Sequence, residues 1–212
     1  MASEHILPAP RSAPWLPSAA VWVPAAIAVS LLVPVVYLVA ICDILGDEAF
    51  GENGPVETLQ VLAILSAAIF FMFAGKRSTG LAGWLCVVLA SVLLIAFQRE
   101  IPNCASAYYG GGICASSSVK AAIAISAVLA ITGSLIVFRF AWRDLLRLRN
   151  LLWLWPLGMM LFILGAGAIA ERHALVDVEE MMELAAYAYL LAFAGWVWRV
   201  RSGGSDRRPR LS

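Results

Sequence analysis

Residues 151–170 read LLWLWPLGMMLFILGAGAIA, a run of 20 positions without a charged residue. A helix needs about 20 apolar residues to cross the hydrocarbon core of a bilayer. The whole chain is 62% hydrophobic and 14% charged, whereas soluble domains contain about 25% charged residues. These values indicate a membrane protein. Five further apolar runs lie at 19–41, 55–74, 81–97, 119–140 and 181–200.

The apolar runs are continuous and do not alternate with polar residues, which favours helices over the strands of a membrane barrel. We therefore expect an all-α fold, a polytopic membrane protein with a six-helix transmembrane domain over 19–200. An N-terminal arm over 1–18 would precede it, and a basic tail over 201–212 would follow. Pro34 is expected to kink the first helix and widen the cavity. Gly165 and Gly167 are expected to allow close helix approach in the fifth.

Basic and acidic residues separate when the six spans are laid out in order. On the side that holds both termini lie 12 of the 15 Lys and Arg residues, and on the other side lie 11 of the 14 Asp and Glu residues. Cytoplasmic segments of membrane proteins are enriched in Lys and Arg. We therefore expect both termini in the cytoplasm, with the protein in the inner membrane of a Gram-negative-like bacterium.

The longest outer loop carries two of the four cysteines, Cys104 and Cys114, on either side of three glycines. An oxidising exterior would let them pair. The alternative is two free thiols, and Cys42, on the same side, is a competing partner. Cys86 lies near the inner end of its span and is expected to pack in the bundle.

Several outer acids have an ordinary structural explanation. Acids in the first turn of a helix stabilise its exposed N–H groups. Gly54 as N-cap and Pro55 as first helical residue would place Glu57 in such a turn. Asp177 and Glu180 have capping-box spacing. Asp47, Glu48 and Glu52 would then be solvated loop residues, and Glu179 would need no function.

Three acids lie where capping does not explain them. Glu100 and Glu171 fall at the C-terminal ends of their helices, where the helix dipole disfavours a carboxylate. Glu183 lies more than one turn inside the last helix, and an intramembrane carboxylate usually faces the bundle interior. Glu180, Glu183 and Tyr187 share a helix face, as do Glu57 and Gln60. We therefore expect an outer polar site. Its predicted ligand-binding residues are Glu57, Gln60, Arg99, Glu100, Lys120, Arg172 and Tyr187, with Arg99, Lys120 and Arg172 as counter-charges.

Three states of this site are compatible with its composition. The charges can form a structural ion-pair network, as in other buried clusters. Neighbouring carboxylates can share a proton. Carboxylates with one imidazole can also bind a divalent metal ion, which would be the cofactor. The candidate metal ligands are Glu100, Glu171, His173, Glu180 and Glu183.

Three functions remain open. The first is an inner-membrane protein whose outward-facing, carboxylate-rich site binds a cation or a polar ligand. The second is a metal-assisted lipid hydrolase or transferase of the outer leaflet, with Glu183 as base and His173 as a metal ligand. The third is an accessory subunit of a larger membrane complex. Expected partners are membrane lipids, with a membrane-protein partner or a second copy of the chain under the third function. The sequence contains no nucleic-acid patch, nucleotide loop or Ser–His–Asp arrangement.

Overall fold

The computed structural model describes residues 16–36, 54–106, 112–173 and 175–203. Within them the chain is helical, and six helices are long and apolar enough to cross a membrane. The all-α prediction is therefore confirmed for this part of the chain. The long helices are α1 (Ala19–Val36), α3 (Pro55–Lys76), α4 (Gly80–Glu100), α5 (Ser117–Phe138), α8 (Trp155–Arg172) and α9 (Val176–Gly203). Short elements α6 (Trp142–Leu146), α7 (Leu148–Leu151) and η3 (Leu152–Leu154) join α5 to α8.

Some predictions fall on residues that are not described. The arm 1–18 is described only from residue 16, and the tail 201–212 only to residue 203. The acids predicted to be solvated loop residues, Asp47, Glu48 and Glu52, lie outside the described residues, as does Cys42.

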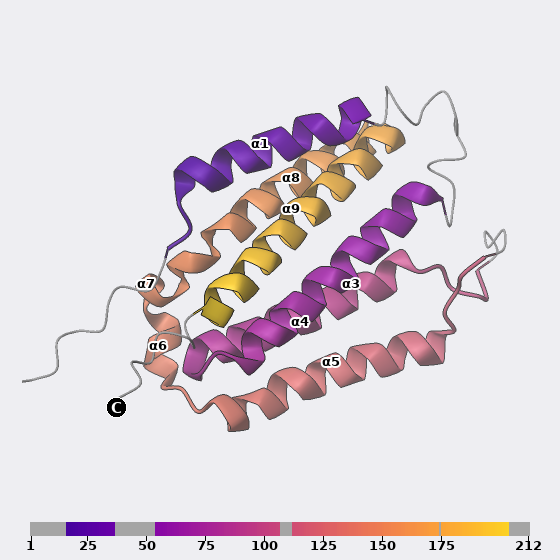
Figure 1. Cartoon of the computed structure of the whole chain (residues 1–212). Coiled ribbons are helices and arrows are strands. Elements are labelled where there is room, and N and C mark those ends of the chain that lie inside the picture. The colour runs from indigo at the N-terminus through magenta and orange to yellow at the C-terminus, as the bar shows by residue number, and fades with distance from the viewer. Residues whose placement is uncertain (1–15, 37–53, 107–111, 174, 204–212) are drawn as a thin grey trace, which may run out of the picture.

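The two ends of the bundle, which lie at opposite ends of the long helices in Figure 1, differ in charge. The Trp155 indole N–H donates to the Pro17 carbonyl oxygen at 3.0 Å, and the Arg201 guanidinium carbon lies 6.0 Å from the Trp153 ring centroid. These contacts bring the start of α1 and the end of α9 to one end, which we call the basic end. It is defined by Lys76, Arg77, Arg143, Arg147, Arg149 and Arg201. The opposite end, the acidic end, is defined by Glu57, Glu100, Glu171, Glu180 and Glu183.

Helices α3 and α9 form the centre of the bundle. Ile64 and Phe71 of α3 and Phe193 and Val197 of α9 are fully buried. The Trp22 ring attaches α1 to this core, with its centroid 5.4 Å from that of Phe193 in an edge-on arrangement. Lipid is as apolar as these side chains, so close van der Waals packing, more than the hydrophobic effect, holds the helices together. The polar residues near this core are therefore positioned by tightly packed helices.

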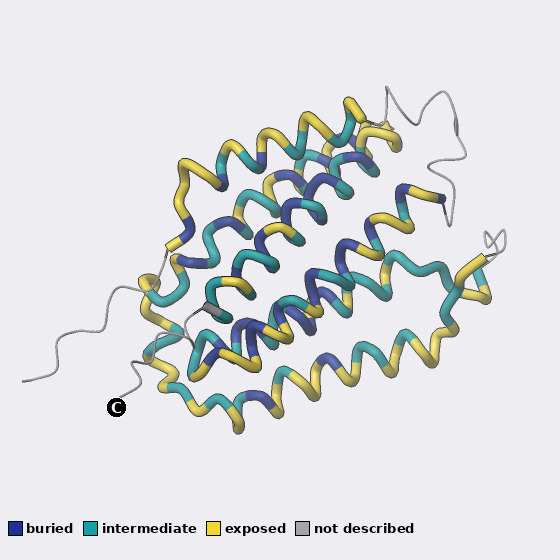
Figure 2. Tube along the Cα trace, in the orientation of Figure 1, coloured by how far each residue is buried: buried dark blue, intermediate teal, exposed yellow. Residues whose placement is uncertain are grey.

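Helices α1 and α5 lie at the periphery (Figures 1 and 2). Most of α5 is exposed, and its large apolar side chains Ile136 and Val137 are 74% and 75% exposed. Such apolar outer faces are what a bilayer solvates. Helix α1 contacts α9 and α8.

Only one of the two glycines predicted to allow close approach does so. A Cβ atom at Gly167 would lie 3.4 Å from the Met182 Cβ and 3.5 Å from the Glu179 carbonyl oxygen, so α8 and α9 meet there. A Cβ atom at Gly165 would meet nothing within 4 Å. Pro34 lies inside α1, which continues to Val36, so this residue does not end the helix.

The fifth span is interrupted near its start. Pro156 has no N–H to donate to the Leu152 carbonyl, so the regular α-helical ladder cannot run through this turn. The chain forms the 3₁₀ turn η3 instead, in which the Trp155 N–H bonds to the Leu152 carbonyl oxygen. The predicted single helix over 151–170 is therefore α7, η3 and α8.

At Gly83, α4 leaves no room for a side chain. A methyl group there would overlap the Phe138 ring and lie 2.9 Å from the Ser78 carbonyl oxygen. We expect Gly83→Ala to destabilise the protein by about 1–3 kcal/mol, as other overpacked sites do. The measurement is the thermal unfolding midpoint in detergent. Gly133→Ala is the matched control, because a Cβ atom at Gly133 meets nothing within 4 Å. Equal midpoints for the two variants would contradict the packing at Gly83.

Candidate functional site

A buried amide joins α3 to α9 at the acidic end. Gln60 is 1% exposed, and its side-chain N–H₂ donates to the Glu180 carbonyl oxygen at 3.0 Å and to the Glu180 Oε2 at 2.8 Å. Both helices place these residues one to two turns from their outer ends. Because a buried amide in an apolar bundle is costly without partners, this contact fixes the register of α3 against α9.

Two carboxylates meet beside this contact, at the C-terminal end of α4 and inside α9. The Arg99 Nη2 lies 3.4 Å from the Glu183 Oε1, and the Arg99 Nε lies 3.8 Å from the Glu100 Oε1. The Tyr187 hydroxyl donates to the same Glu100 oxygen at 3.2 Å. The predicted grouping of Arg99, Glu100, Glu183 and Tyr187 is therefore present in the structure.

The charges in this group do not balance. The side chains of Glu100 and Glu183 are 10% and 15% exposed, whereas that of Arg99 is 73% exposed. One guanidinium at the surface thus faces two largely buried carboxylates. Glu57 and Glu180 also lie close enough to Glu100 to act on it electrostatically. The group has an excess of negative charge and can accept a cation or a proton.

The start of α3 is as predicted, whereas the start of α9 is not. Gly54 is the N-cap of α3, Pro55 begins it, and Glu57 lies in its first turn. The predicted capping box at Asp177 and Glu180 is wrong. Helix α9 begins at Val176, one residue before Asp177, so Asp177 lies in the first turn, and Glu180 bonds to Gln60.

The other predicted counter-charges lie apart from the group. Lys120 is in the first turn of α5, a helix that packs on α4, and Arg172 is exposed at the end of α8. Neither forms a salt bridge within the described residues. Glu171 and His173 are also exposed. Arg99 is therefore the counter-charge that reaches Glu100 and Glu183.

The five candidate metal ligands do not come together. In the part of the chain that the structure describes, no group of three or more His, Cys, Asp or Glu side chains could hold a metal ion. The reason is geometric, because Glu171 and His173 lie at the end of α8 while Glu180 turns to Gln60. In the metal-enzyme hypothesis, His173 is a metal ligand and Glu183 is the base. No ion pair joins these two side chains within the described residues.

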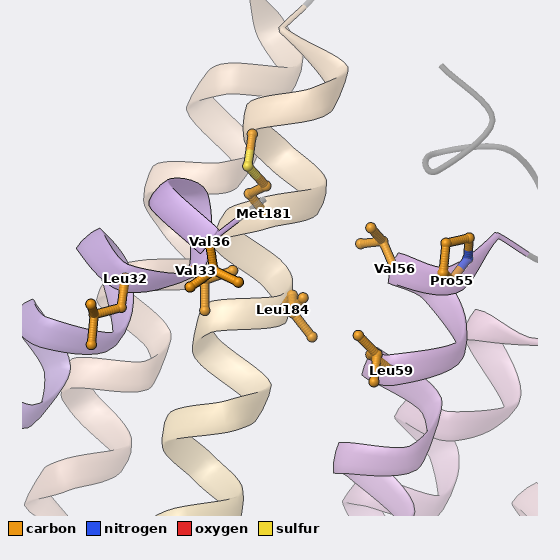
Figure 3. Close-up of a pocket in the computed structure, with 8 residues that line it drawn as sticks. All are labelled: Leu32, Val33, Val36, Pro55, Val56, Leu59, Met181 and Leu184. Atoms are coloured by element: carbon orange, nitrogen blue, oxygen red, sulfur yellow. The ribbon is translucent and has the colours of Figure 1, made fainter. Parts of the chain in front are cut away.

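An apolar groove lies beside the polar group, between α1 and α3 (Figure 3). Met181 and Leu184 of α9 lie between the two helices in this view. The groove has a volume of about 210 Å³ and is lined by Leu32, Val33, Val36, Pro55, Val56, Leu59, Met181 and Leu184. It carries no charged side chain, so it is suited to hydrocarbon and not to an ion.

A second pocket, of about 230 Å³, lies between α3 and α4 and does include carboxylates. We call it the α3–α4 pocket. Its lining residues are Glu57, Thr58, Val61, Leu65, Phe97, Glu100, Ile101, Pro102 and Ile113. The apolar members were not predicted as site residues, because Val61, Leu65 and Phe97 are indistinguishable in sequence from lipid-facing or core residues.

The loop after α4 forms one wall of this pocket and is cross-linked. Cys104 and Cys114 form a disulfide, which confirms the predicted pairing. The Ala115 N–H donates to the Pro102 carbonyl oxygen at 2.9 Å, and the Asn103 side-chain N–H₂ donates to the Ser117 hydroxyl at 2.8 Å. Among the described cysteines Cys86 is the free thiol, buried in α4 as expected.

Comparison with known proteins adds no relative. No protein-family model, curated protein or solved structure matches this chain.

Proposed function

We propose that this protein is a multi-pass membrane protein whose acidic end forms an outward-facing polar site that binds a cation or a cationic polar ligand. The observation that carries the proposal is the meeting of Glu100 and Glu183 around Arg99. Two largely buried carboxylates share one exposed guanidinium, and carboxylates inside a membrane span mark binding or transport sites more often than structural ones. A positively charged ligand would complete the charge balance.

A single organic cation or a proton suits this site better than a resident metal ion. Calcium takes six to eight oxygen ligands, and zinc usually takes at least three protein ligands. The described residues offer no group of three such side chains. Two carboxylates, a tyrosine hydroxyl and an apolar pocket nearby are instead suited to an ammonium group.

We place the acidic end outside a bacterial cytoplasmic membrane and both termini inside. The arginine-rich basic end favours the cytoplasm by the positive-inside rule. The disulfide at the acidic end favours an oxidising exterior. We expect green fluorescent protein fused after Ser212 to fluoresce and alkaline phosphatase fused there to be inactive. The reverse pattern would place the carboxylates in the cytoplasm and contradict the orientation.

Ligand binding can be tested by thermal unfolding of the purified protein with added cations. The probes are magnesium, calcium, manganese, zinc, ammonium and methylammonium chlorides, with elemental analysis of protein purified without chelator. A ligand at 100 times its Kd stabilises the folded state by about 2.7 kcal/mol. We expect at least one probe to raise the unfolding midpoint of the wild type, and Glu183→Gln to remove this increase.

Glu171→Gln is the matched control, because Glu171 is exposed at the end of α8. It should retain the response to the cation. If no probe stabilises the wild type while Glu183→Gln simply lowers stability, the charges form a structural ion-pair network and the proposed function is incorrect.

A further inference from the structure

The α3–α4 pocket combines two features, a pair of carboxylates and a largely apolar lining. Glu57 and Glu100 contribute a carboxylate from each helix, and the rest of the lining is largely apolar. The stretch of α3 from Glu57 to Leu65 is about 12 Å long, at about 1.5 Å per residue. The pocket is therefore long enough for a chain of several carbon atoms.

Glu100 supplies the polar atom that a ligand in this pocket would meet. Its side chain is nine-tenths buried, and the contacts it makes with Tyr187 and Arg99 both use Oε1. Within the described residues Oε2 forms no hydrogen bond or ion pair. This oxygen is not among the fully buried atoms that lack a partner, so a ligand in the pocket can reach it. An ammonium group supplies both donors and charge to such a carboxylate.

The apolar lining of the α3–α4 pocket favours a hydrocarbon chain attached to that ammonium group. Val61 and Leu65 of α3 and Phe97 of α4 lie farther along the helices, toward the membrane centre, than Glu57 and Glu100. A hydrated metal ion would leave these surfaces unused, whereas a hydrocarbon chain would cover them. Pro102 and Ile113 form the loop side of the pocket, and the disulfide and the bond from Ala115 to Pro102 hold them in place.

We infer that the ligand of this site is a single-chain aliphatic amine, a cationic ammonium head joined to one hydrocarbon tail. The head lies between Glu57 and Glu100, and the tail runs along Val61, Leu65 and Phe97. This inference rests on the proposed function, because it names the class of cation that the acidic end binds.

The test compares methylammonium, octylammonium, octanoate and 1-octanol by thermal unfolding of the full chain in one detergent. We expect octylammonium to act at a concentration at least tenfold lower than methylammonium, because each buried methylene adds roughly fourfold in affinity before competition from detergent. Octanoate and 1-octanol partition into the same micelles but lack the ammonium group. We expect neither to stabilise the protein.

Two variants separate the pocket from general partitioning. Val61→Phe fills the pocket and should abolish the advantage of octylammonium while leaving the response to methylammonium. Leu62→Phe is the matched control, because Leu62 is on the same helix, is 53% exposed and does not line the pocket. It should behave as wild type.

The outcomes distinguish this inference from the proposed function. Equal potency of methylammonium and octylammonium in the wild type, or an unchanged advantage of octylammonium in Val61→Phe, would overturn the tail site and leave the cation site standing. Stabilisation by octanoate as strong as that by octylammonium would overturn the recognition of charge. Failure of every amine, with a response to one of the metal ions, would overturn the amine and retain the cation site. Failure of every cation would overturn both.

Discussion

Gln60→Leu is expected to lower the stability of the protein by about 2–4 kcal/mol. The substitution keeps the size of a side chain that is 1% exposed and removes both hydrogen bonds to Glu180. A bond to a charged group contributes about 1.5–3 kcal/mol, and a buried acceptor left without a donor costs about 1–3 kcal/mol. The measurement is the unfolding midpoint in denaturant or heat, in detergent micelles.

Thr58→Val provides the control on the same helix. Thr58 is exposed, and its hydroxyl donates to the Gly54 carbonyl oxygen within its own first turn at 2.9 Å. We expect its effect to remain below about 1 kcal/mol. If Gln60→Leu unfolds at the wild-type midpoint, the contact between Gln60 and Glu180 does not hold α3 against α9.

Arg99→Gln is expected to change stability and binding in opposite directions. Without the guanidinium, Glu100 and Glu183 lose the cation that lies 3.8 and 3.4 Å from them, so the free protein should unfold at a lower temperature. The site also gains net negative charge. Because Arg99 is mostly exposed and solvent screens its charge, we expect a gain in cation affinity of about tenfold, well below the unscreened Coulomb value.

The control for this substitution is Arg172→Gln. Arg172 is exposed and forms no salt bridge within the described residues, so neither stability nor affinity should change appreciably. Lower stability of Arg99→Gln without any gain in affinity would indicate that Arg99 belongs to a purely structural ion-pair network.

The six helices could be predicted from the sequence because bilayer thickness imposes the same length on each span. Helix ends were predicted less well. The glycine and proline at 54 and 55 are a local signal, and the start of α3 follows it. The 3₁₀ turn before Pro156 also has a local cause, the missing N–H of this proline. It was not predicted because Pro156 lies within a continuous apolar run. Asp177 has the chemistry of a cap, yet α9 begins one residue earlier and Glu180 bonds to Gln60.

The candidate site was predicted where a residue conflicts with its own helix. Glu183 is too deep to cap α9, and Glu100 opposes the dipole of α4, so each needs a tertiary partner. Glu171 raises the same conflict at the end of α8 but lies exposed. Its different outcome depends on how α8 is rotated, which side-chain packing decides. The same rotation brings Gly167, but not Gly165, against α9.

No feature of the sequence distinguishes the apolar residues of the site from other apolar residues. Val61, Leu65 and Phe97 line the α3–α4 pocket only because the fold brings α3, α4 and the cross-linked loop together there. Counter-charges were also predicted from proximity in sequence, which holds for Arg99 beside Glu100 but does not bring Arg172 or Lys120 to the group. The ion pair between Arg99 and Glu183 instead joins α4 to α9, two helices that both pack against α3.

The most direct test is a binding isotherm of the most strongly stabilising cation with wild-type protein and with the double variant Glu100→Gln/Glu183→Gln. Both proteins should retain their helical circular dichroism spectrum, because glutamine preserves the shape of each side chain while removing its negative charge. We predict that the double variant loses at least a hundredfold in affinity. A folded double variant that binds the same cation as tightly as the wild type would show that these carboxylates are not the site.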